Sequence, residues 1–314
     1  MIKPTILILL STYNGEKYLK QQLDSILDQK DVDIKLLIRD DCSTDSTLSI
    51  LNNYQKKFPK QINLFQGENI GFIKSFSYLV KIGLELYPEI KYYAFADQDD
   101  YWEPEKIRKA YEKIHDIKED VSLLYCSDLN IVDENLKELG YKIRKSDHYT
   151  NNFINNYKYS CLLINYGAGC TMLFNKKAAQ LYNQIYKDTF LFHDDLMYRI
   201  CMILGKVVYD ETSYIRYRQH SLNSSGAAPS PINKLKKRLK FTWLYGHKLE
   251  KINKEFYRLI ENYINYRDKE MIQTLMNYRQ SLFKRFQLLF NKKIRYYSKK
   301  RDFLYRIRII LGTV

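Results

Sequence analysis

The sequence predicts an α/β fold with a mostly parallel central sheet and helices on both faces, followed by a C-terminal α-helical region. Three observations support this prediction. Short apolar runs alternate with amphipathic helical patterns through the first half of the chain, which is typical of a parallel sheet. Hydrophobic residues make up 45% of the 314 residues, which is enough for a substantial core. The last part of the chain is strongly basic.

The first strand is expected over residues 5–10, where an apolar run ends at polar Ser11. A helix is expected over residues 16–29, because Leu19, Leu23 and Ile26 recur on one stripe after the turn at Asn14. The same alternation predicts strands at 34–38, 62–65, 92–96, 123–127, 206–209 and 213–217, and helices at 46–58, 69–86, 105–115 and 196–204.

The net charge of +15 is unevenly distributed. Residues 227–314 contain 22 Lys or Arg and 6 Asp or Glu, which leaves 29 basic and 30 acidic residues in the remainder. The segment Ala-Ala-Pro-Ser-Pro at 227–231 separates the two parts. We therefore expect one domain over residues 1–226 and a basic amphipathic helical region over residues 227–314, with a boundary near residue 228.

In the basic region, apolar residues recur at helical spacings among Lys and Arg, as at Phe283, Phe286, Leu289 and Phe290. Basic amphipathic helices suit the anionic cytoplasmic face of a membrane. The alternative is that these helices pack on the body or on a second protomer in a homodimer, with their charges merely solvated. Nucleic acid is not an expected partner, because the region has no groove-reading motif.

Cysteine usage and hydropathy indicate a cytoplasmic protein, and its basic helices lead us to expect it to be peripheral on the inner face of the cell membrane. The apolar N-terminal run ends in polar residues with no small-residue cleavage site, so we expect a buried strand there and no signal peptide. No apolar stretch approaches the roughly 20 residues that span a bilayer. The five cysteines are scattered without metal-binding spacing and are expected to be reduced: Cys42, Cys126, Cys161, Cys170 and Cys201.

Three carboxylates, Asp97, Asp99 and Asp100, directly follow the buried strand expected at 92–96. Such closely spaced like charges need a cation or hydrogen-bond donors, and Mg²⁺ and Mn²⁺ prefer oxygen ligands together with substrate phosphates. The carboxyl end of a strand is also where ligands bind in open α/β sheets. The residues therefore predict a metal-diphosphate site. The alternative is an acidic turn that caps the helix at 105–115.

Four polar motifs occur in order along the chain: residues 11–16, 39–45, 97–100 and 193–195. Together they resemble the motifs of family 2 glycosyltransferases, inverting nucleotide-sugar enzymes with a GT-A fold, and the resemblance covers residues 3 to about 225. The opening STYNGEKYLKQQLDSILDQ, the DQDDYW form, the Gly169–Met172 segment, the HDD and the Arg218–His220 segment are most similar to bacterial rhamnosyltransferases of cell-surface polysaccharide assembly.

Donor binding is expected at the first two motifs. Thr12 and Tyr13 lie just past a strand, where an aromatic face can stack on a pyrimidine and a hydroxyl can bond its edge; alternatively, Tyr13 packs against the first helix. A carboxylate at Asp40 or Asp41 can accept the imide N–H of uracil or thymine or bond a ribose hydroxyl, and the resemblance assigns that work to this pair. Cys42 stands where the family usually has Gly, which restricts φ at this turn.

Other polar residues of these loops have structural alternatives. Asp40 and Asp41 can instead serve in capping, and Asp45 is expected only to cap the helix at 46–58. Gly71 is expected to open the helix near the donor, although an ordinary loop glycine is equally consistent with the sequence.

The resemblance implies metal ligands and phosphate contacts. It gives Asp97 the ribose and base-side contacts and Asp99 the Mg²⁺ or Mn²⁺ that bridges the diphosphate, with Asp100 as an additional candidate. His220 resembles the late histidine that joins the metal in some GT-A enzymes. Arg218 can neutralise phosphate, because the forked donors of arginine suit that role.

Inversion at the sugar carbon requires a carboxylate that takes the proton of the acceptor hydroxyl. We expect Asp194 to be this base, since it is the first carboxylate after the His of the family's motif. Asp195 would lie about 100° around the same helix, so both are not expected to reach one hydroxyl. His193 either orients the acceptor or is a structural histidine with satisfied hydrogen bonds.

The expected activity is a metal-dependent inverting transfer of L-rhamnose from dTDP-β-L-rhamnose to a glycan or lipid-linked glycan acceptor. Two alternatives remain at this point: the same fold with another UDP- or dTDP-hexose donor, and a non-catalytic nucleotide-sugar-binding scaffold of a polysaccharide assembly complex. A phosphoryl transferase is disfavoured, because the chain has no GxxxxGK[ST] loop.

Overall fold

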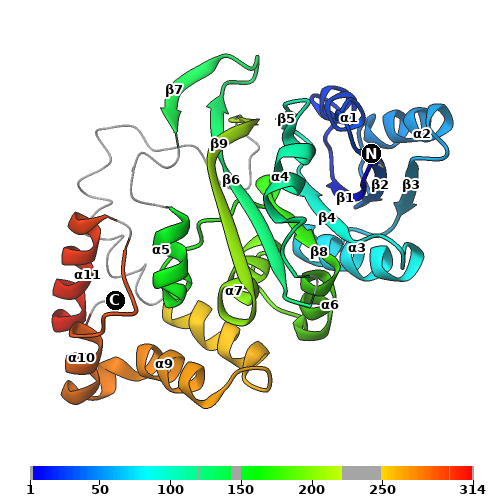
Figure 1. Ribbon diagram of the computed structural model, residues 1–314. Coiled ribbons are helices and arrows are strands. Elements are labelled where there is room, and N and C mark those ends of the chain that lie inside the picture. Colours follow the sequence, from blue (N-terminus) through cyan, green and yellow to red (C-terminus); the bar gives the residue numbers. More distant parts are fainter. Residues whose placement is uncertain (1–2, 119, 143–149, 221–248, 297, 313–314) are drawn as a thin grey trace. The chain divides into compact units, whose positions relative to one another are not determined.

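The computed structural model describes residues 3–118, 120–142, 150–220, 249–296 and 298–312. A nine-stranded sheet runs through the described part of the chain in the order β3-β2-β1-β4-β8-β6-β9-β5, with β7 paired to β6 (Figure 1). Strands β1 to β4 are parallel, as are β6 and β9, whereas β5, β7 and β8 are antiparallel to their neighbours. The predicted mostly parallel α/β fold is confirmed.

The strands are β1 (Thr5–Thr12), β2 (Asp33–Asp40), β3 (Ile62–Gln66), β4 (Tyr92–Ala96), β5 (Tyr101–Trp102), β6 (Leu123–Val132), β7 (Glu138–Lys142), β8 (Leu173–Asn175) and β9 (Lys206–Arg218). The helices around the sheet are α1 (Leu19–Leu27), α2 (Thr47–Lys57), α3 (Phe72–Leu86), α4 (Lys106–Ile114), α6 (Lys176–Ile185) and α7 (His193–Leu204). Short 3₁₀ turns lie at η1 (Lys158–Leu162) and η2 (Gly169–Thr171).

Successive side chains of a strand point to opposite faces of the sheet. Different helices therefore pack on the two faces. In β1, the buried Ile6, Ile8 and Leu10 belong to the core that α1, α2 and α4 complete. The intervening Leu7 and Leu9 face α3, whose Gly83 lies so close that an added Cβ would be 2.8 Å from a Leu7 methyl. Glycine at this position therefore permits the close packing of α3 on the sheet.

Some elements differ from the sequence prediction. Strands β5, β7 and β8 and helix α6 were not predicted, and the strands predicted at 206–209 and 213–217 are one continuous strand, β9. The first helix starts at Leu19, after a turn at residues 16–18, rather than at residue 16. None of the five cysteines, all of which lie in the described residues, forms a disulfide; Cys42 is exposed and the other four are buried.

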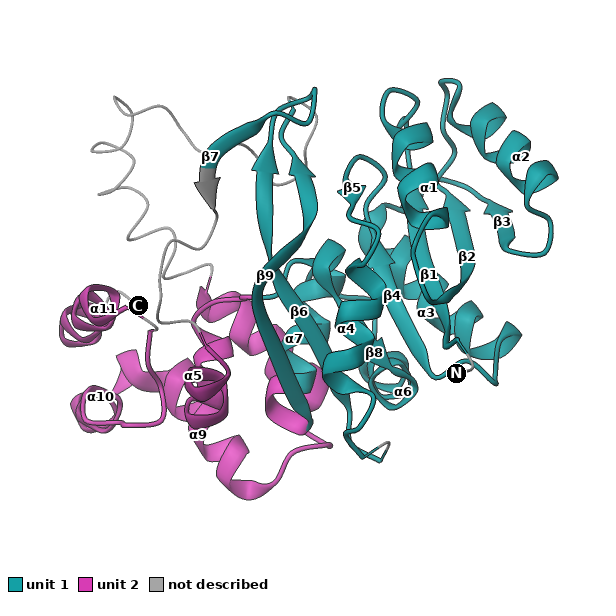
Figure 2. Ribbon diagram, turned by 45° about the horizontal axis from the view of Figure 1, so that its top comes forward, with its two compact units in different colours: residues 1–145, 167–201, 205–220 teal, residues 146–166, 202–204, 221–314 magenta. Residues whose placement is uncertain are grey.

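The chain forms two compact units (Figure 2). Unit 1 comprises residues 1–145, 167–201 and 205–220 and contains the sheet; unit 2 comprises residues 146–166, 202–204 and 221–314. The domain boundary predicted near residue 228 lies outside the described residues and stays a prediction, as does the helical pattern before residue 249. Among the described helices, none is long and apolar enough to cross a bilayer.

Unit 2 is helical where the structure describes it. It contains α5 (Asn151–Asn156), a helical segment over residues 249–260, α9 (Tyr266–Asn277), η4 (Tyr278–Gln280), α10 (Leu282–Leu289) and α11 (Lys299–Leu311). Phe256, Ile260 and Ile272 are completely buried within it. Tyr159 donates to Asp268 Oδ1 at 2.6 Å, which joins η1 to the start of α9. The helices predicted in the basic region are confirmed for this described part.

Candidate active site

The candidate active site lies at the carboxyl ends of β1, β2 and β4. These strands are parallel neighbours, and their register pairs Thr12 with Asp40 and Leu10 with Ala96. Asp97 therefore leaves the sheet on the same edge as Thr12 and Asp40. The first three predicted motifs meet at this edge, where ligands bind in open α/β sheets.

The loops after β1 and β2 hold each other through hydrogen bonds. Asn14 Oδ1 accepts from the backbone N–H of Thr44 at 2.8 Å. Asp45 accepts from the N–H groups of Thr47 at 2.9 Å and Glu16 at 3.1 Å. Asp45 lies one residue before the N-cap Ser46 and accepts from the first N–H of α2, but its bond to Glu16 shows that capping the helix is not its only role, contrary to the sequence prediction. The two loops thus form one rigid rim of the site.

Asp40 is fully buried at the end of β2. Its carboxylate accepts from the hydroxyl of Thr12 at 2.9 Å, and from the N–H and hydroxyl of Ser43 at 2.9 and 2.6 Å. A buried carboxylate needs such donors, and they come here from the chain itself. Asp40 therefore stabilises the turn after β2, and its contact with the donor stays a prediction.

Asp41 joins the second motif to the start of α3. It forms a buried ion pair with Arg39 and accepts from the N–H of Gly71 at 2.8 Å and of Ile70 at 3.2 Å. Gly71 has φ +79°, and an added Cβ would meet no atom within 4 Å, so its backbone conformation rather than space requires glycine. Helix α3 starts at the next residue, which confirms Gly71 as the residue that opens this helix.

Cys42 adopts φ +66° in the turn after β2. This left-handed conformation costs a residue with a Cβ roughly 1–2 kcal/mol. The backbone at Cys42 is therefore strained, as the sequence led us to expect. The hydrogen bonds between Asp40 and Ser43 and between Asp41 and Gly71 hold this turn in place.

Tyr13 presents its ring at this edge, with 47% of the residue exposed, so it is not packed into the core. The backbone of Tyr13 is held by Gln98, whose Oε1 accepts from the Tyr13 N–H at 2.8 Å and whose Nε2 donates to the Tyr13 carbonyl at 3.0 Å. Gly15 makes room for this contact, because an added Cβ would lie 2.4 Å from Gln98 Oε1. The sequence reasoning did not assign this role to Gln98.

The carboxylates after β4 lie in a strongly acidic environment. Burial, together with the charges of Asp99 and Asp194, raises the pKa of Asp97 to about 7. Burial and the neighbouring carboxylates also raise the pKa of Asp100, which accepts from the backbone N–H of Arg218 at 3.2 Å. Ligand atoms of Asp97, Asp100 and Cys170 lie within 4.8 Å of one another. A cation near this group would relieve their mutual repulsion.

Asp99 and His220, the two predicted metal ligands, are in direct contact. His220 Nε2 lies 2.8 Å from Asp99 Oδ2, and the side chains are 10% and 17% exposed. The ring of His220 also packs against Tyr18, with centroids 4.8 Å apart. A carboxylate oxygen and an imidazole nitrogen, among further carboxylates, fit the donor set that Mn²⁺ accepts. The assignment of these residues as ligands stays a prediction.

Arg218 is buried beneath the turn that carries Asp99. Its Nε donates to the Asp99 carbonyl at 2.8 Å, its Nη2 donates to Gln21 Oε1 at 2.6 Å, and its Nη1 donates to the Glu134 carbonyl. The guanidinium lies 4.4 Å over the ring of Tyr18. Arg218 thus positions the backbone of the acidic turn, while its predicted phosphate contact stays a prediction.

Lys106 is a buried cation of this region that sequence reasoning missed. It is 2% exposed, and its ammonium lies 3.6 Å from the centre of the Trp102 ring. Burial lowers its pKa to about 7, against the smaller opposing effects of the neighbouring Cys170 and Asp100. A lysine at the first position of an amphipathic helix is normally solvated, so no sequence signal marked it.

Asp194 and Asp195 open α7 with different partners. Asp194 accepts from the N–H of Gly169 at 3.2 Å and of Asp195 at 2.7 Å, while burial and then the charge of Asp195 raise its pKa to about 7. Asp195 is paired with buried Arg199 at 2.9 Å. Gly169 permits this approach, because an added Cβ would lie 3.3 Å from the Asp194 Cβ and 2.8 Å from His193 Nε2.

His193 corrects one expectation. Its imidazole is buried and stacks on Phe76 at 3.8 Å between centroids, with Phe95 edge-on at 4.7 Å. Neither ring nitrogen has a hydrogen-bond partner among the residues that the structure describes, so the expected satisfied histidine is wrong. Burial lowers its pKa to about 3, which keeps the ring neutral. The aromatic contacts stabilise the buried ring carbons, whereas the two ring nitrogens add a desolvation cost that these contacts do not offset.

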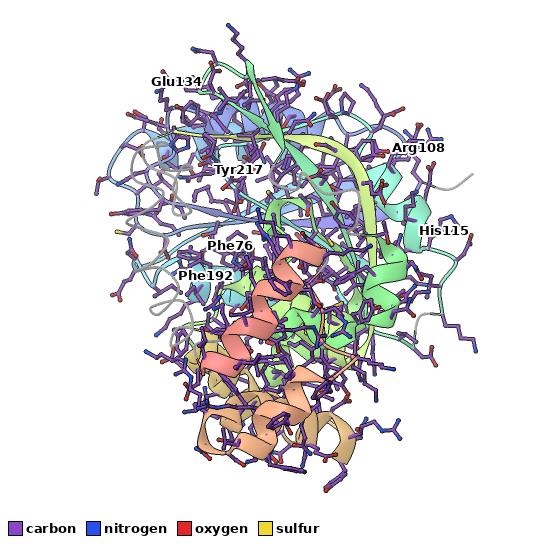
Figure 3. The ribbon with its side chains drawn as sticks, turned by 90° about the vertical axis from the view of Figure 1, so that its left-hand side faces the viewer. Phe76, Arg108, His115, Glu134, Phe192 and Tyr217 are labelled. Carbon is purple, nitrogen blue, oxygen red and sulfur yellow. The ribbon has the colours of Figure 1, made fainter. Side chains whose placement is uncertain are left out.

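An exposed aromatic pair lies beside the start of α7. The rings of Phe72 and Phe192 are 5.0 Å apart and are 37% and 48% exposed. Phe192 directly precedes α7, and Figure 3 shows it near Phe76, which contacts His193. An ion pair of 3.0 Å between Lys74 and Asp188 joins the two segments that carry the pair.

Comparisons with known proteins agree with this architecture. The profile of the family described as "Glycosyl transferase family 2" matches residues 7–181. The chain is 31% identical to the "dTDP-rhamnosyl transferase RfbG" of Shigella flexneri over 228 residues, which cover 69% of the chain and 74% of that relative. It is also 31% identical over 110 residues to the "Putative teichuronic acid biosynthesis glycosyltransferase TuaG" of Bacillus subtilis, covering 35% of the chain and 42% of that relative.

Two solved structures share the fold. S. aureus TarS 1–349 in complex with UDP-GlcNAc matches with a TM-score of 0.56 at 17% identity, over 100% of this chain and 82% of that one. The mannosyltransferase PcManGT of Pyrobaculum calidifontis, in complex with GDP-Man and Mn²⁺, matches with a TM-score of 0.51 at 13% identity, over 100% and 88%. At these identities the likeness shows the fold alone.

Proposed function

Because this chain belongs to glycosyltransferase family 2, we propose that it is a metal-dependent, inverting enzyme that transfers L-rhamnose from dTDP-β-L-rhamnose to a lipid-linked glycan. The observation that carries this proposal is the grouping of Asp97, Asp99, His220 and Asp194 in unit 1. Asp99 and His220 are in contact, and Asp194 is near enough to Asp97 for its charge to raise the pKa of that carboxyl. The 31% identical dTDP-rhamnosyl transferase supports the choice of sugar. We assign catalysis to residues 1–226.

The donor nucleotide is proposed to lie against the rim formed by the loops after β1 and β2. The exposed ring of Tyr13, whose backbone Gln98 holds, offers a stacking face for the base. Thr12, Asp40 and Asp41 shape the turn beneath it, and Asp97 is proposed to take the ribose.

Asp99 and His220 would hold Mg²⁺ or Mn²⁺, with Asp100 as an additional candidate. When bound, the cation supplies electrostatic stabilisation of the charge that develops on the departing nucleoside diphosphate. Arg218 holds the Asp99 carbonyl and so orients the turn that carries the ligand.

Asp194 is proposed as the general base. Its carboxylate takes the proton from the acceptor hydroxyl while the acceptor oxygen bonds to the anomeric carbon from the face opposite the diphosphate. The bond from that carbon to the phosphate oxygen breaks, and its electron pair leaves with the nucleoside diphosphate. A pKa of about 7 suits this role, since a general base is most effective when its pKa lies near the working pH. Asp195 is paired with Arg199 and is not proposed to share this role.

The acceptor is proposed to approach Asp194 past the exposed rings of Phe72 and Phe192. Aromatic faces are common in binding sites because they give large apolar contact with little loss of conformational freedom. A lipid-linked acceptor would place the reaction at the inner face of the cell membrane, with the basic region of residues 227–314 as the part that attracts the enzyme to anionic lipid.

A UDP-hexose is the second candidate donor, since TarS, whose fold this chain shares, was solved in complex with UDP-GlcNAc. A non-catalytic nucleotide-sugar-binding scaffold is the remaining alternative.

Calorimetric titration of the full chain with dTDP-β-L-rhamnose, UDP-glucose, UDP-galactose and UDP-N-acetylglucosamine, each with and without Mn²⁺, tests the proposal. We expect the tightest, Mn²⁺-dependent binding for dTDP-rhamnose. If a UDP-sugar bound more tightly, that sugar would replace dTDP-rhamnose as the proposed donor. If every donor bound equally well without Mn²⁺, Asp99 and His220 would not be metal ligands for donor binding. Binding without any release of nucleoside diphosphate would favour the scaffold.

A further inference from the structure

Helices α10 and α11 form a pair in unit 2, and we call residues 282–311 the C-terminal hairpin. The two helices are neighbours in Figure 1. Arg285 near the start of α10 donates to the Ile310 carbonyl near the end of α11 at 3.3 Å. Nine of the 18 large apolar side chains that are exposed in the described structure lie in this hairpin. Such a concentration in a small part of a chain marks an interaction surface.

The exposed apolar residues form a stripe on each helix. Phe283, Phe286 and Phe290 recur at spacings of three and four along α10 and its C-cap and are 71%, 58% and 71% exposed. A spacing of three and four residues places them on one helical face.

On α11, Phe303, Ile307 and Ile310 repeat the pattern, with exposures of 64%, 36% and 56%. The other faces of both helices supply the buried Leu288, Tyr305 and Ile309. The apolar stripes are therefore additional to the residues that hold the hairpin together.

The charge of the hairpin is almost entirely positive. Residues 282–311 contain ten Lys or Arg and one acidic residue, Asp302. Asp302 forms an ion pair of 3.1 Å with Arg306. Its negative charge is therefore balanced within α11 and does not neutralise the exposed lysines and arginine. The exposed cations lie between the helices and on the first turn of α11: Lys292, Lys293, Lys299, Lys300 and Arg301.

We propose that the C-terminal hairpin lies in the surface of an anionic membrane, with its aromatic and aliphatic stripes inserted at the boundary of headgroups and acyl chains and its exposed lysines on lipid phosphates. Apolar stripes beside Lys and Arg are the pattern of helices that lie in a membrane interface. A second copy of the chain fits this surface less well than a membrane does. A two-fold contact through this face would bring the basic clusters of both copies together, and their like charges would repel. Since no described helix is long enough to span, the hairpin lies on the membrane and does not cross it.

This proposal goes beyond charge attraction, because insertion of apolar side chains is not screened by salt. It also does not depend on the identity of the donor or on catalysis. Membrane binding should therefore have a salt-sensitive part, from the lysines, and a salt-resistant part, from the stripes.

Co-sedimentation of the full chain with vesicles tests this at low and high salt. The vesicles are phosphatidylcholine alone, or phosphatidylcholine with an equal part of phosphatidylglycerol. Phe283→Ser/Phe286→Ser/Phe290→Ser should weaken binding to the anionic vesicles at both salt concentrations, by about tenfold or more per inserted ring. Lys292→Gln/Lys293→Gln/Lys299→Gln/Lys300→Gln should lose the preference for anionic lipid and the salt dependence, but keep the residual salt-resistant binding.

The matched control is Tyr266→Ser, which removes an aromatic residue that is 80% exposed on α9 and should leave vesicle binding unchanged. Thermal melting and Mn²⁺-dependent nucleotide binding of each variant report whether the fold is intact. Unchanged vesicle binding by the triple phenylalanine variant, or wild-type binding that disappears entirely at high salt, overturns the insertion. A phenylalanine variant that converts a dimer to a monomer in sedimentation equilibrium, with vesicle binding intact, assigns the stripes to a second copy instead.

Discussion

Replacing Asp194 with Asn should remove transfer and stabilise the fold in the same variant. Burial, with a smaller contribution from Asp195, raises the pKa of Asp194 from 3.8 to about 7. For a carboxyl whose pKa is raised by folding, the associated stability is fully present below the unfolded pKa and is lost as the pH rises through about 7. Above that pH the folded wild type contains an unfavourable charge that the Asn variant lacks.

The size of the effect follows from the pKa difference. A rise of about three units corresponds to roughly 4 kcal/mol, because each unit is worth about 1.4 kcal/mol. This figure is an upper bound, since Asp194 is partly exposed and solvent screens its charge. The Asn side chain has one oxygen instead of two, so one of the hydrogen bonds from the N–H groups of Gly169 and Asp195 is lost. This loss destabilises the fold by about 1 kcal/mol. We therefore expect Asp194→Asn to gain roughly 1–2 kcal/mol at pH 8, and to lose that gain at pH 5.

Urea unfolding and thermal melting at pH 5 and pH 8 measure this difference. At about 2–4 °C per kcal/mol, the melting temperature should rise by a few degrees at pH 8 only. Asp195→Asn is the matched control, because it removes the ion pair with buried Arg199 and should destabilise the protein by roughly 3 kcal/mol at both pH values. If Asp194→Asn were destabilised equally at both pH values, the raised pKa and the burial argument would be refuted.

Three further predictions concern the rim and the metal ligands. Asp99→Asn should abolish Mn²⁺-dependent donor binding in calorimetry, because it removes a hard anionic ligand that contacts His220; affinity equal to wild type would exclude Asp99 as a ligand. Gln98→Ala should weaken nucleotide binding about tenfold, with little change in the rate of transfer at saturating donor, because it releases the backbone that presents the ring of Tyr13. Cys42→Gly should raise the free energy of unfolding by up to about 1 kcal/mol, because glycine adopts φ +66° without strain; a loss of stability would show that the turn is not strained.

The fold was predictable where the pattern is long and regular. The strands β1 and β4 are apolar runs of at least five residues, and β2 is apolar apart from Lys35 between Ile34 and Ile38; all three lie beside helices with clear stripes, so periodicity identifies them. Strands β5 and β8 have two and three residues, too few for any period to show. The strand β9 was predicted as two pieces because a polar stretch at residues 210–213 interrupts it, at the point where its register with β6 shifts.

The site was predictable as far as local chemistry determines it. Carboxylates at strand ends mark the acidic edge, and the order of the motifs identifies the family. The roles of Gln98 and Gly169 depend on contacts with Tyr13 and Asp194, which are 85 and 25 residues away in the chain, so no local pattern reports them. Lys106 packs against Trp102, only four residues earlier, but the burial of both depends on the surrounding fold, as the burial of His193 depends on the rings of α3 and β4.

The central claim is that Asp194 and a cation held at Asp99 and His220 together drive release of the nucleoside diphosphate. The most direct measurement is release of dTDP from dTDP-β-L-rhamnose, with water or added glycan as acceptor, by wild type and Asp194→Asn, with and without Mn²⁺. We predict Mn²⁺-dependent release by wild type and near-complete loss in Asp194→Asn, while the affinity of that variant for dTDP stays unchanged. Release at equal rates by both proteins, or no release of nucleoside diphosphate from this donor or any UDP-hexose, would contradict the account.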